Sequence, residues 1–314
     1  MLAIKTLIPQ SIIFRRSIRL MGTQFEIGIV GNNPHWADER IDEAVAEISR
    51  VEKLFNTFSD ESAINEINRH AGVQPVKING EIFRLIARAL QISQLTDGAF
   101  DIIYNTSGKE GNGEHDFNKN AKINGALGRA NYQNVVLDAK DQTIFLQEKY
   151  MRIGFGAIVG GYAADRAKRI LQMNGVQSGV INAGHHLVAW GVQPNDEPWT
   201  VAAADPGQKD EPFANLNISN MAITTSINNE KHTAIINNRY PADINTEKGF
   251  RVSGIKSVSI VSPSAELANA MATPVMSIGI NAGLYLINQL NQLACMIVDD
   301  HGRIYTSKDI CVAN

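Results

Sequence analysis

Two glycine-rich segments contain the residues that could bring backbone amides close to an anion. The first runs from Gly154 to Asp165 and leads into a helix predicted from about residue 161 to 173. The first turn of a helix has N–H groups without intrahelical partners, and these groups suit a phosphate. The glycines are spaced GxGxxxG, which matches neither the dinucleotide fingerprint nor a phosphate loop ending in Gly-Lys-Ser/Thr. Phosphate binding and close helix–strand packing both remain open for this segment.

The second segment, Asn182-Ala-Gly-His-His186, follows a short predicted strand and contains two adjacent histidines. Neighbouring side chains of a strand point to opposite faces, so both imidazoles cannot easily bind one metal ion. We expect one histidine to be buried and the other to be exposed to solvent. Cys295 and Cys311 lack the spacing of a metal site, so we expect them to be packing residues.

The composition excludes several classes of protein. The chain has 314 residues, of which 44% are hydrophobic and 19% charged, and this balance excludes disorder and coiled coils. The formal net charge of -3 argues against nucleic acid as the main partner. No apolar run is long enough to predict a transmembrane segment. We also expect no clear signal peptide and no lipid-acceptor cysteine in the first residues, which leaves the compartment open.

Hydrophobic periodicity predicts the elements that would position these segments. Apolar residues recur every three or four positions over residues 37–58, which indicates an amphipathic helix. Further helices are predicted over 82–95, 161–173, 265–278 and 283–289. Strands are predicted over 23–31, 134–137, 143–146, 152–155, 180–182, 186–190, 199–203, 256–261, 294–298 and 304–306. The strands come in pairs, which favours an α+β fold over a doubly wound sheet. The polar stretches 107–124 and 222–249 do not show this periodicity, and the first of them is predicted to be a long loop.

Seven motifs follow one another in an order that resembles a known family. They are Met21-Gly-Thr-Gln-Phe, Thr57-Phe-Ser-Asp-Glu-Ser-Ala-Ile-Asn-Glu-Ile-Asn68, Thr96-Asp-Gly-Ala-Phe-Asp101, the segment from Gly154 to Asp165, Val180-Ile-Asn-Ala-Gly184, Ala222-Ile-Thr-Thr-Ser226 and Ala268-Asn-Ala-Met-Ala-Thr273. Together they look like the FAD:protein FMN transferases, the ApbE-like family formerly linked to thiamine biosynthesis. The resemblance implies one domain over residues 20–314, with residues 1–19 as an N-terminal extension of unclear role.

The resemblance also implies a fold and an activity. The fold would be α+β, two-lobed and T-fold-like, with paired antiparallel strands, packed helices and FAD between the lobes. The reaction would use Mg²⁺ to break the FAD pyrophosphate and move FMN onto a Thr or Ser of a partner flavoprotein, with release of AMP. Members of the family are commonly periplasmic or membrane-anchored.

The family's functional positions map onto named residues of this chain. The resemblance implies a metal site at Asn269, Thr273 and about Val159, and it makes Asn269 and Thr273 the catalytic positions. The positions implied to bind the flavin nucleotide are Ser59, Asn68, Phe100, Asp101, Gly156, Gly160, Gly161, Tyr162, Asp165, Ala183, Gly184, His185, Thr225 and Ser226.

Several of the reactive positions depart from the family pattern. Asn269 stands where the family has its metal-binding Asp, and hard cations such as Mg²⁺ are usually held through carboxylates. Gly160 stands where the family has a lysine that faces phosphate. Further departures are His185 and His186 after Ala-Gly, Ile227 in place of a glycine, and Ala242 and Asn245 in place of a histidine and an aspartate.

Three hypotheses for the function follow from these matches and departures. The first is an active flavin transferase in which Asp243, Glu266 or His185 substitutes in the metal site. The second is a non-catalytic descendant that binds FAD, another nucleotide or a partner protein, and the loss of the carboxylate favours it. The third is an interaction protein without a ligand.

Overall fold

An eight-stranded antiparallel sheet lies at the centre of the molecule. The computed structural model describes residues 11–57, 59, 61–105, 130–204, 212–228, 244–245, 250–251, 254–308 and 312–313. In spatial order the strands are β1 (Ile12–Leu20), β2 (Thr23–Gly31), β8 (Gly179–Ala183), β9 (His186–Trp190), β12 (Ala222–Ile227), β15 (Ile255–Ser262), β16 (Ala294–Asp299) and β17 (Ile304–Thr306). Strands distant in sequence, such as β2 and β8, are therefore neighbours.

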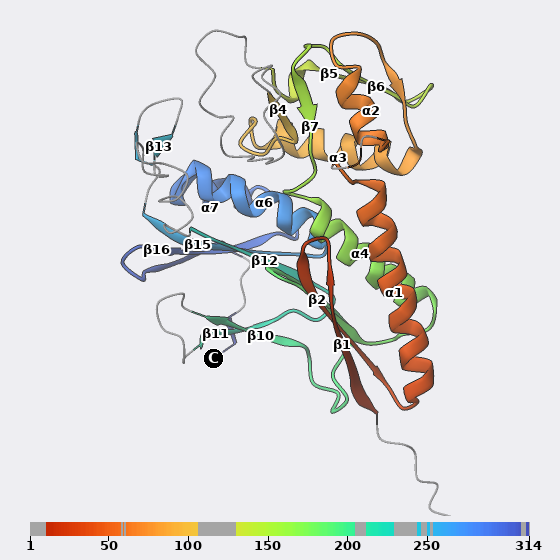
Figure 1. The fold of residues 1–314 in the computed structure, drawn as a ribbon. Coiled ribbons are helices and arrows are strands. Elements are labelled where there is room, and N and C mark those ends of the chain that lie inside the picture. Colours follow the sequence, from red (N-terminus) through yellow and green to blue (C-terminus); the bar gives the residue numbers. More distant parts are fainter. Residues whose placement is uncertain are drawn as a thin grey trace, which may run out of the picture.

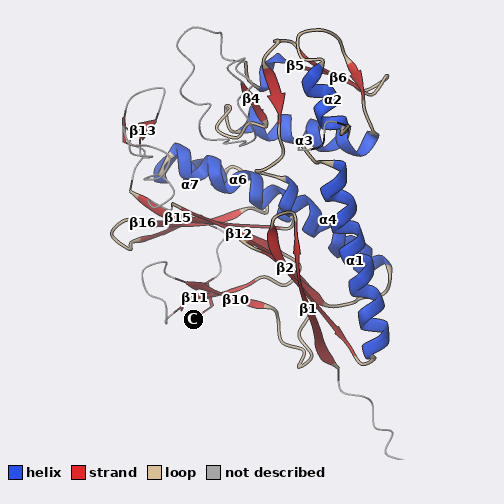
Figure 2. Ribbon diagram, viewed as in Figure 1, coloured by secondary structure: helices blue, strands red, loops and turns tan. Residues whose placement is uncertain are grey.

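Four helices cover one face of this sheet (Figure 1). They are α1 (Pro34–Leu54), α4 (Val159–Met173), α6 (Ala265–Ile278) and α7 (Ile280–Asn288). Phe25, Ile27 and Ile29 alternate along β2 and are fully buried in the core beneath these helices. A short sheet of β10 (Thr200–Ala204), β11 (Pro212–Asn217) and β18 (Val312–Ala313) lies on the opposite side, as Figure 2 shows. Ile223, Val261 and Met296 belong to a second, smaller core.

A smaller lobe lies beyond the helices, at the top of Figure 1. Its helices are α2 (Ala63–Arg69), α3 (Gly80–Leu95) and the 3₁₀ turn η2 (Tyr132–Asn134). Its strands are β3 (Val76–Lys77), β4 (Ile103–Asn105), β5 (Val135–Asp138), β6 (Thr143–Leu146) and β7 (Met151–Ile153). One further antiparallel pair of strands, β13 (Ile244–Asn245) with β14 (Phe250–Arg251), precedes β15 in the sequence.

Side-chain caps explain where the main helices begin. Asn33 accepts from the amide of Trp36, and Pro34 occupies the first turn of α1. Asn79 caps α3 by accepting from the amide of Glu81 at 2.6 Å. These caps lie before the first apolar residues of the periodic pattern, so α1 and α3 begin two or three residues earlier than the periodicity predicts.

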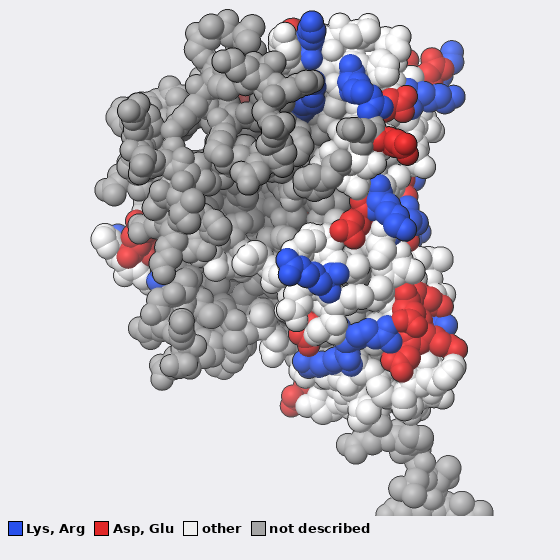
Figure 3. Space-filling view, in the orientation of Figure 1, with Lys and Arg blue, Asp and Glu red and all other residues white. Residues whose placement is uncertain are grey.

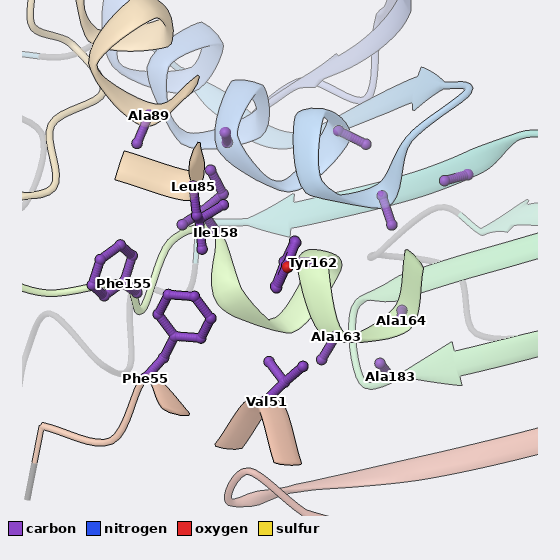
Figure 4. Close-up of a cluster of buried hydrophobic side chains, with 14 of the residues drawn as sticks. Val51, Phe55, Leu85, Ala89, Phe155, Ile158, Tyr162, Ala163, Ala164 and Ala183 are labelled. Carbon is purple, nitrogen blue, oxygen red and sulfur yellow. The ribbon is translucent and has the colours of Figure 1, made fainter. Parts of the chain in front are cut away.

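The two lobes share one core at the start of α4. Phe55, directly after α1, contacts Phe155 edge to face with 5.0 Å between ring centroids, and Tyr162 in the same way at 5.7 Å. Figure 4 shows Leu85 and Ala89 of α3 facing this cluster from the smaller lobe. Burial of these rings and aliphatic chains fixes the start of α4 between α1 and α3.

Charged side chains on the visible face are mixed in sign. Arg16 of β1 lies 2.9 Å from Asp38 and also contacts Asp42, both on α1. Figure 3 shows blue and red side chains intermixed on the right-hand side, where α1 lies in Figure 1. Exposed pairs of this kind are each worth about 0–1 kcal/mol, so they add little to the packing of β1 and β2.

Most of the predicted elements are present, and the α+β prediction is confirmed. The predicted helix 265–278 and strands 143–146, 186–190 and 304–306 have the bounds of α6, β6, β9 and β17. Helix α2 and several short strands outside the central sheet were not predicted, and two strands of the central sheet were missed. β1 overlaps the predicted extension 1–19, and β12 lies in the polar stretch 222–249. Both contain residues that favour strands, but neither shows a clear apolar–polar alternation, and pairing with neighbouring strands defines them. The predicted loop 107–124 lies outside the described residues. No described helix has the length and hydropathy that a membrane span requires.

Candidate functional site

The start of α4, the start of β9 and the middle of α6 meet beside Gly160. A Cβ atom placed on Gly160 would lie 3.4 Å from Nε2 of His186 and 4.0 Å from Nδ2 of Asn269. These two side chains thus flank the same space next to the first turn of α4. The helix begins after Ile158 without a side-chain cap, and the amide of Val159 donates to the carbonyl of Phe155 at 2.9 Å. The amides of Gly160 and Gly161 are therefore the groups of this turn that suit an anion.

The two adjacent histidines have different environments, as expected. His185 lies exposed in the turn between β8 and β9, whereas His186 is partly buried at the start of β9. Nδ1 of His186 lies 3.0 Å from Oγ1 of the buried Thr224 on β12. Burial, and secondarily the charge of His185, lowers the pKa of His186 to about 4. The imidazole of His186 is therefore neutral at pH 7.

Asn269 and Thr273 lie four residues apart on α6 and so share one face of the helix. The side-chain nitrogen of Asn269 is buried and has no hydrogen-bond partner. Leaving a buried amide donor unpaired costs about 1–3 kcal/mol. Thr273 is exposed. The unpaired amide next to an uncapped helix start is the feature expected of a place that binds a ligand.

Asp165 and Gly161 of α4 hold the beginning of α6. The carboxylate of Asp165 accepts from the hydroxyl of Ser264 at 2.8 Å and from the amides of Ala265 and Glu266 at 3.0 and 2.9 Å. A Cβ atom on Gly161 would overlap the carbonyl oxygen of Ala265. Gly161 therefore allows close packing, but against helix α6 and not against a strand, as the sequence had suggested. Asp165 acts in this structure as a cap that positions α6, and its contact with a nucleotide stays a prediction.

Glu266 is engaged in an ion pair between the lobes. It accepts two hydrogen bonds, at 2.6 and 2.8 Å, from Arg88 of α3. The guanidinium of Arg88 lies 5.8 Å from the ring centroid of Tyr162, whose hydroxyl donates to Glu81 at 2.6 Å. Burial and the Glu81 carboxylate both raise the pKa of Tyr162. Because its oxygens are taken by Arg88, Glu266 is a poor substitute for the family's metal-binding carboxylate.

Several other predicted positions lie in the frame around this junction. Asn68 is buried, and its amide pairs with the backbone of Ile153, accepting at 2.7 Å and donating at 3.3 Å. Phe100 is buried, and its amide donates to Thr96 at 3.0 Å. Tyr162 is 7% exposed within the shared core. For these residues a structural role is visible, and a role in nucleotide binding stays a prediction.

Asp101 connects two segments, one at β4 and one at η2, through hydrogen bonds of its carboxylate. Its carboxylate accepts from the amide of Ile103 at 2.9 Å and from the amide of Tyr132 at 2.9 Å. Burial raises the pKa of Asp101 to about 6, against the lowering effect of these backbone hydrogen bonds. A raised acid pKa means that the folded state holds the proton more tightly than the unfolded chain does.

The raised pKa of Asp101 predicts a pH-dependent stability. The contribution of its protonated form is fully present below about pH 4 and is lost as the pH rises through about 6. In the Asp101→Asn variant this loss is absent, so the stability difference between variant and wild type should shift in favour of the variant by about 2–3 kcal/mol between pH 4 and pH 7. Urea unfolding at both pH values measures this shift. A stability difference that is the same at pH 4 and pH 7 would contradict the prediction. An additional offset, equal at both pH values, reports only the hydrogen bond that asparagine cannot accept.

The remaining predicted positions lie at strand ends, in turns or before the start of α4. Ala183 ends β8, and Gly184 follows in the turn with φ of 67°. Thr225 of β12 shares a hydrogen bond of 2.8 Å between its hydroxyl and that of Ser259, and its amide donates to the carbonyl of His185 at 3.1 Å. The other predicted positions are the exposed Ser59 and Gly156, and the partly buried Val159 and Ser226.

The comparison with protein families assigns the chain. The model described as the ApbE family matches residues 21–297, which include the glycine segment, both histidines and the α6 motif. The chain belongs to the ApbE family. Among named relatives, it is 26% identical to an FAD:protein FMN transferase of Klebsiella pneumoniae, with 85% of each chain covered. It is 24% identical to the FAD:protein FMN transferase of Treponema pallidum, with 95% of this chain and 87% of the relative covered.

Solved structures show the same fold. The apo flavinyl transferase ApbE of Pseudomonas stutzeri superimposes with a TM-score of 0.73 at 20% identity, with 95% of this chain and 96% of that chain covered. An ApbE protein of Thermotoga maritima gives a TM-score of 0.74 at 22% identity, with 94% and 97% covered. The predicted ApbE-like fold is therefore confirmed.

The donors at the predicted ApbE metal position do not form the usual site for Mg²⁺. Asn269, Thr273 and the backbone at Val159 offer an amide oxygen, a hydroxyl and a carbonyl, all of them uncharged. Among the residues that the structure describes, no group of three or more His, Cys, Asp or Glu is arranged to hold a metal ion. Mg²⁺ is usually bound through one or two carboxylates. The described residues therefore do not fit a carboxylate-held magnesium ion.

Sequence reasoning missed two contributors to the junction. Thr224 was not singled out, although it lies in the Ala222–Ser226 motif, and its alternation with Thr225 along β12 could have placed one of the two threonines toward the helices. The ion pair of Arg88 could not be predicted from the sequence, because its partner Glu266 lies 178 residues away.

Proposed function

We propose that this protein transfers FMN from FAD onto a hydroxyl group of a partner flavoprotein and releases AMP. The observation that carries this proposal is the match of the ApbE family model over residues 21–297. The glycine segment, His186 and the Ala268–Thr273 motif meet beside Gly160, at one junction of α4, β9 and α6. The transferase names of the curated relatives favour this activity over a non-catalytic descendant.

The residues of this chain would contribute mainly by binding and orienting the pyrophosphate. In the first turn of α4, the amides of Gly160 and Gly161 would donate to phosphate oxygens, and Gly160 adds no side chain between them and the ligand. In the reaction, the bond between the FMN phosphorus and the bridging oxygen of the FAD pyrophosphate breaks, and the bridging oxygen leaves with AMP. The acceptor hydroxyl loses its proton and forms a new bond to the FMN phosphorus. Amides held in place by the α4 packing would stabilise the charge that develops on the phosphoryl oxygens.

A specific observation supports a second candidate, a descendant that binds FAD without turnover. Asn269 replaces the family's carboxylate, and a buried donor there is left unpaired. Phosphoryl transfer depends strongly on charge neutralisation, so a neutral site would bind substrate better than it would turn it over.

The two candidates differ in AMP release. The full chain is incubated with FAD and, in separate samples, with Mg²⁺, Mn²⁺, Co²⁺ or Zn²⁺, and AMP is measured by chromatography beside a chelated control. Flavin binding is followed in parallel by fluorescence. The transferase proposal expects AMP in at least one metal sample and none with chelator. Flavin binding that survives the chelator without AMP in any sample would replace it with the non-catalytic candidate. No flavin binding at all would favour an interaction protein.

A further inference from the structure

One side chain of the smaller lobe, Arg88 of α3, contacts the starts of both helices at the junction. Its guanidinium donates from Nε to one carboxylate oxygen of Glu266 at 2.6 Å and from a terminal nitrogen to the other at 2.8 Å. Glu266 is the second residue of α6. The same guanidinium lies 5.8 Å from the ring centroid of Tyr162, in the first turn of α4. Arg88 therefore connects α3 with both α4 and α6.

A second residue of α3 holds the same tyrosine. Glu81, in the first turn of α3, accepts a hydrogen bond of 2.6 Å from the hydroxyl of Tyr162. Arg50 of α1 donates to the two oxygens of Glu81 at 2.9 and 2.8 Å, which fixes that carboxylate in turn. Glu81 and Arg88 are seven residues apart and so lie on one face of α3. This face thus holds the first turn of α4 at the hydroxyl and at the ring of Tyr162.

The two partners of the ion pair differ in exposure. Glu266 is 8% exposed, whereas the side chain of Arg88 is 42% exposed. A buried carboxylate is costly without its partner, while a half-exposed guanidinium remains solvated. The sequence hypothesis named Glu266 and Asp243 as substitutes for the lost carboxylate. The oxygens of Glu266 bind Arg88 instead, and Asp243 lies outside the described residues.

Glu266 shares a helix face with the predicted site residues of α6. Asn269 and Thr273 follow it by three and seven positions, and this spacing places all three side chains on one side of the helix. The amide of Glu266 donates to Asp165 of α4 at 2.9 Å. The backbone of Glu266 is therefore fixed to α4 and its side chain to α3. Two parallel hydrogen bonds from a planar guanidinium also fix the direction of approach, which a single charge does not.

We propose that Arg88 is a positioning residue of the candidate site, which holds the first turns of α4 and α6 in their relative positions through Tyr162 and Glu266. The inference rests on the proposed function, because its effect on turnover presupposes transfer of FMN from FAD. Arg88 acts through these two residues and not by contact with the reacting atoms. A displacement of about 1 Å in a site can cost about a hundredfold in rate, so a pair at its edge can control kcat.

The first test needs no turnover. Hydrogen exchange of the full chain, without FAD, is followed by mass spectrometry in wild type and in Arg88→Ala. We expect exchange in segments 159–165 and 264–270 to become at least about tenfold faster in the variant, and exchange in β2 to stay unchanged. A pair that contributes only to global stability would change all three segments or none. A wild type that releases no AMP would therefore refute the transfer proposal alone.

The second test separates kcat from KM. AMP release is measured against FAD concentration at a temperature where thermal melting shows every variant to be folded, and the amount of bound flavin gives the competent fraction. We expect Arg88→Ala to lower kcat about ten- to a hundredfold, with the KM for FAD within about threefold of wild type. Glu266→Ala should have the same effects on kcat and on local exchange. The double variant should lose no more than either single variant, because both substitutions break one pair.

Arg84→Ala is the matched control. It removes an exposed arginine one turn earlier on the same helix and should behave as wild type in both tests. Two results would overturn the inference. One is exchange in segments 159–165 and 264–270 that is equal in Arg88→Ala and in this control. The other is a double variant whose loss in kcat is the product of the two single losses. If Arg88→Ala does not fold, Glu266→Ala takes its place in the first comparison, because it leaves no buried charge.

Discussion

Replacing Asn269 with aspartate is expected to raise the affinity for Mg²⁺ by about ten- to a hundredfold. The change adds one negative charge at the position where the described donors are uncharged. A carboxylate in contact with a dication gains far more Coulomb energy than an amide dipole does, and it is the ligand type that Mg²⁺ prefers. Calorimetric titration of the metal-free protein with Mg²⁺ measures the change. If the transferase proposal is correct, AMP release from FAD in the presence of Mg²⁺ should increase in the same variant.

A matched control separates a new ligand from a mere change in net charge. Asn195 is exposed in the turn before β10, and its Oδ1 accepts from the amide of Glu197, a bond that aspartate can also make. Asn195→Asp adds the same charge away from α6 and should leave the Mg²⁺ affinity unchanged. An Asn269→Asp variant that gains no more than this control would mean that the metal position is not at Asn269.

Gly161→Ala is expected to cost about 3 kcal/mol or more in the free energy of unfolding. The added Cβ would overlap the carbonyl oxygen of Ala265 and lie 2.6 Å from its carbonyl carbon and 2.8 Å from the amide nitrogen of Glu266. These are backbone atoms that cannot rotate away, so α4 and α6 would have to separate. The Asp165 cap at the same end of α6 would be strained by that separation. Urea unfolding followed by circular dichroism measures the loss.

Gly160→Ala is the natural control for this prediction. It adds the same methyl group one residue earlier in the same helix, where the nearest atoms are 3.4 Å away in the His186 ring. Alanine is a better helix former than glycine by up to about 1 kcal/mol, so stability should be unchanged or slightly higher. Equal destabilisation by the two substitutions would show that helix propensity, and not the contact with α6, governs this segment.

The main elements could be predicted because their patterns are local. The 3.6-residue period of residues 265–278 matches α6 at both ends, since Ser264 caps the start and Gly279 follows the last turn. The alternation in residues 23–31 likewise matches β2. β12 escaped prediction because its threonines and serine carry little apolar signal. It is a strand only because β9 and β15 lie on either side of it.

The candidate site was predicted in part, and for a different reason. The order of the motifs placed Gly160, His185 and Asn269 in one site without any knowledge of distance. The same motifs could not show that Asp165 caps α6 or that Arg88 occupies Glu266. Hydrogen bonds between residues 100 or more positions apart leave no trace in local periodicity.

The amino-acid sequence by itself thus determined the family and most of the helices, because these are properties of residue identity and order. That Asn269 stands at a metal-binding position stays a prediction from the resemblance. Only the tertiary structure decided which of the two histidines lies beside Gly160. His186 and not His185 flanks Gly160, because β9 turns one ring toward the helices and leaves the other in an exposed turn. The difference of one residue depends on the pairing of β9 with β8 and β12, and strand pairing is a long-range property of the chain.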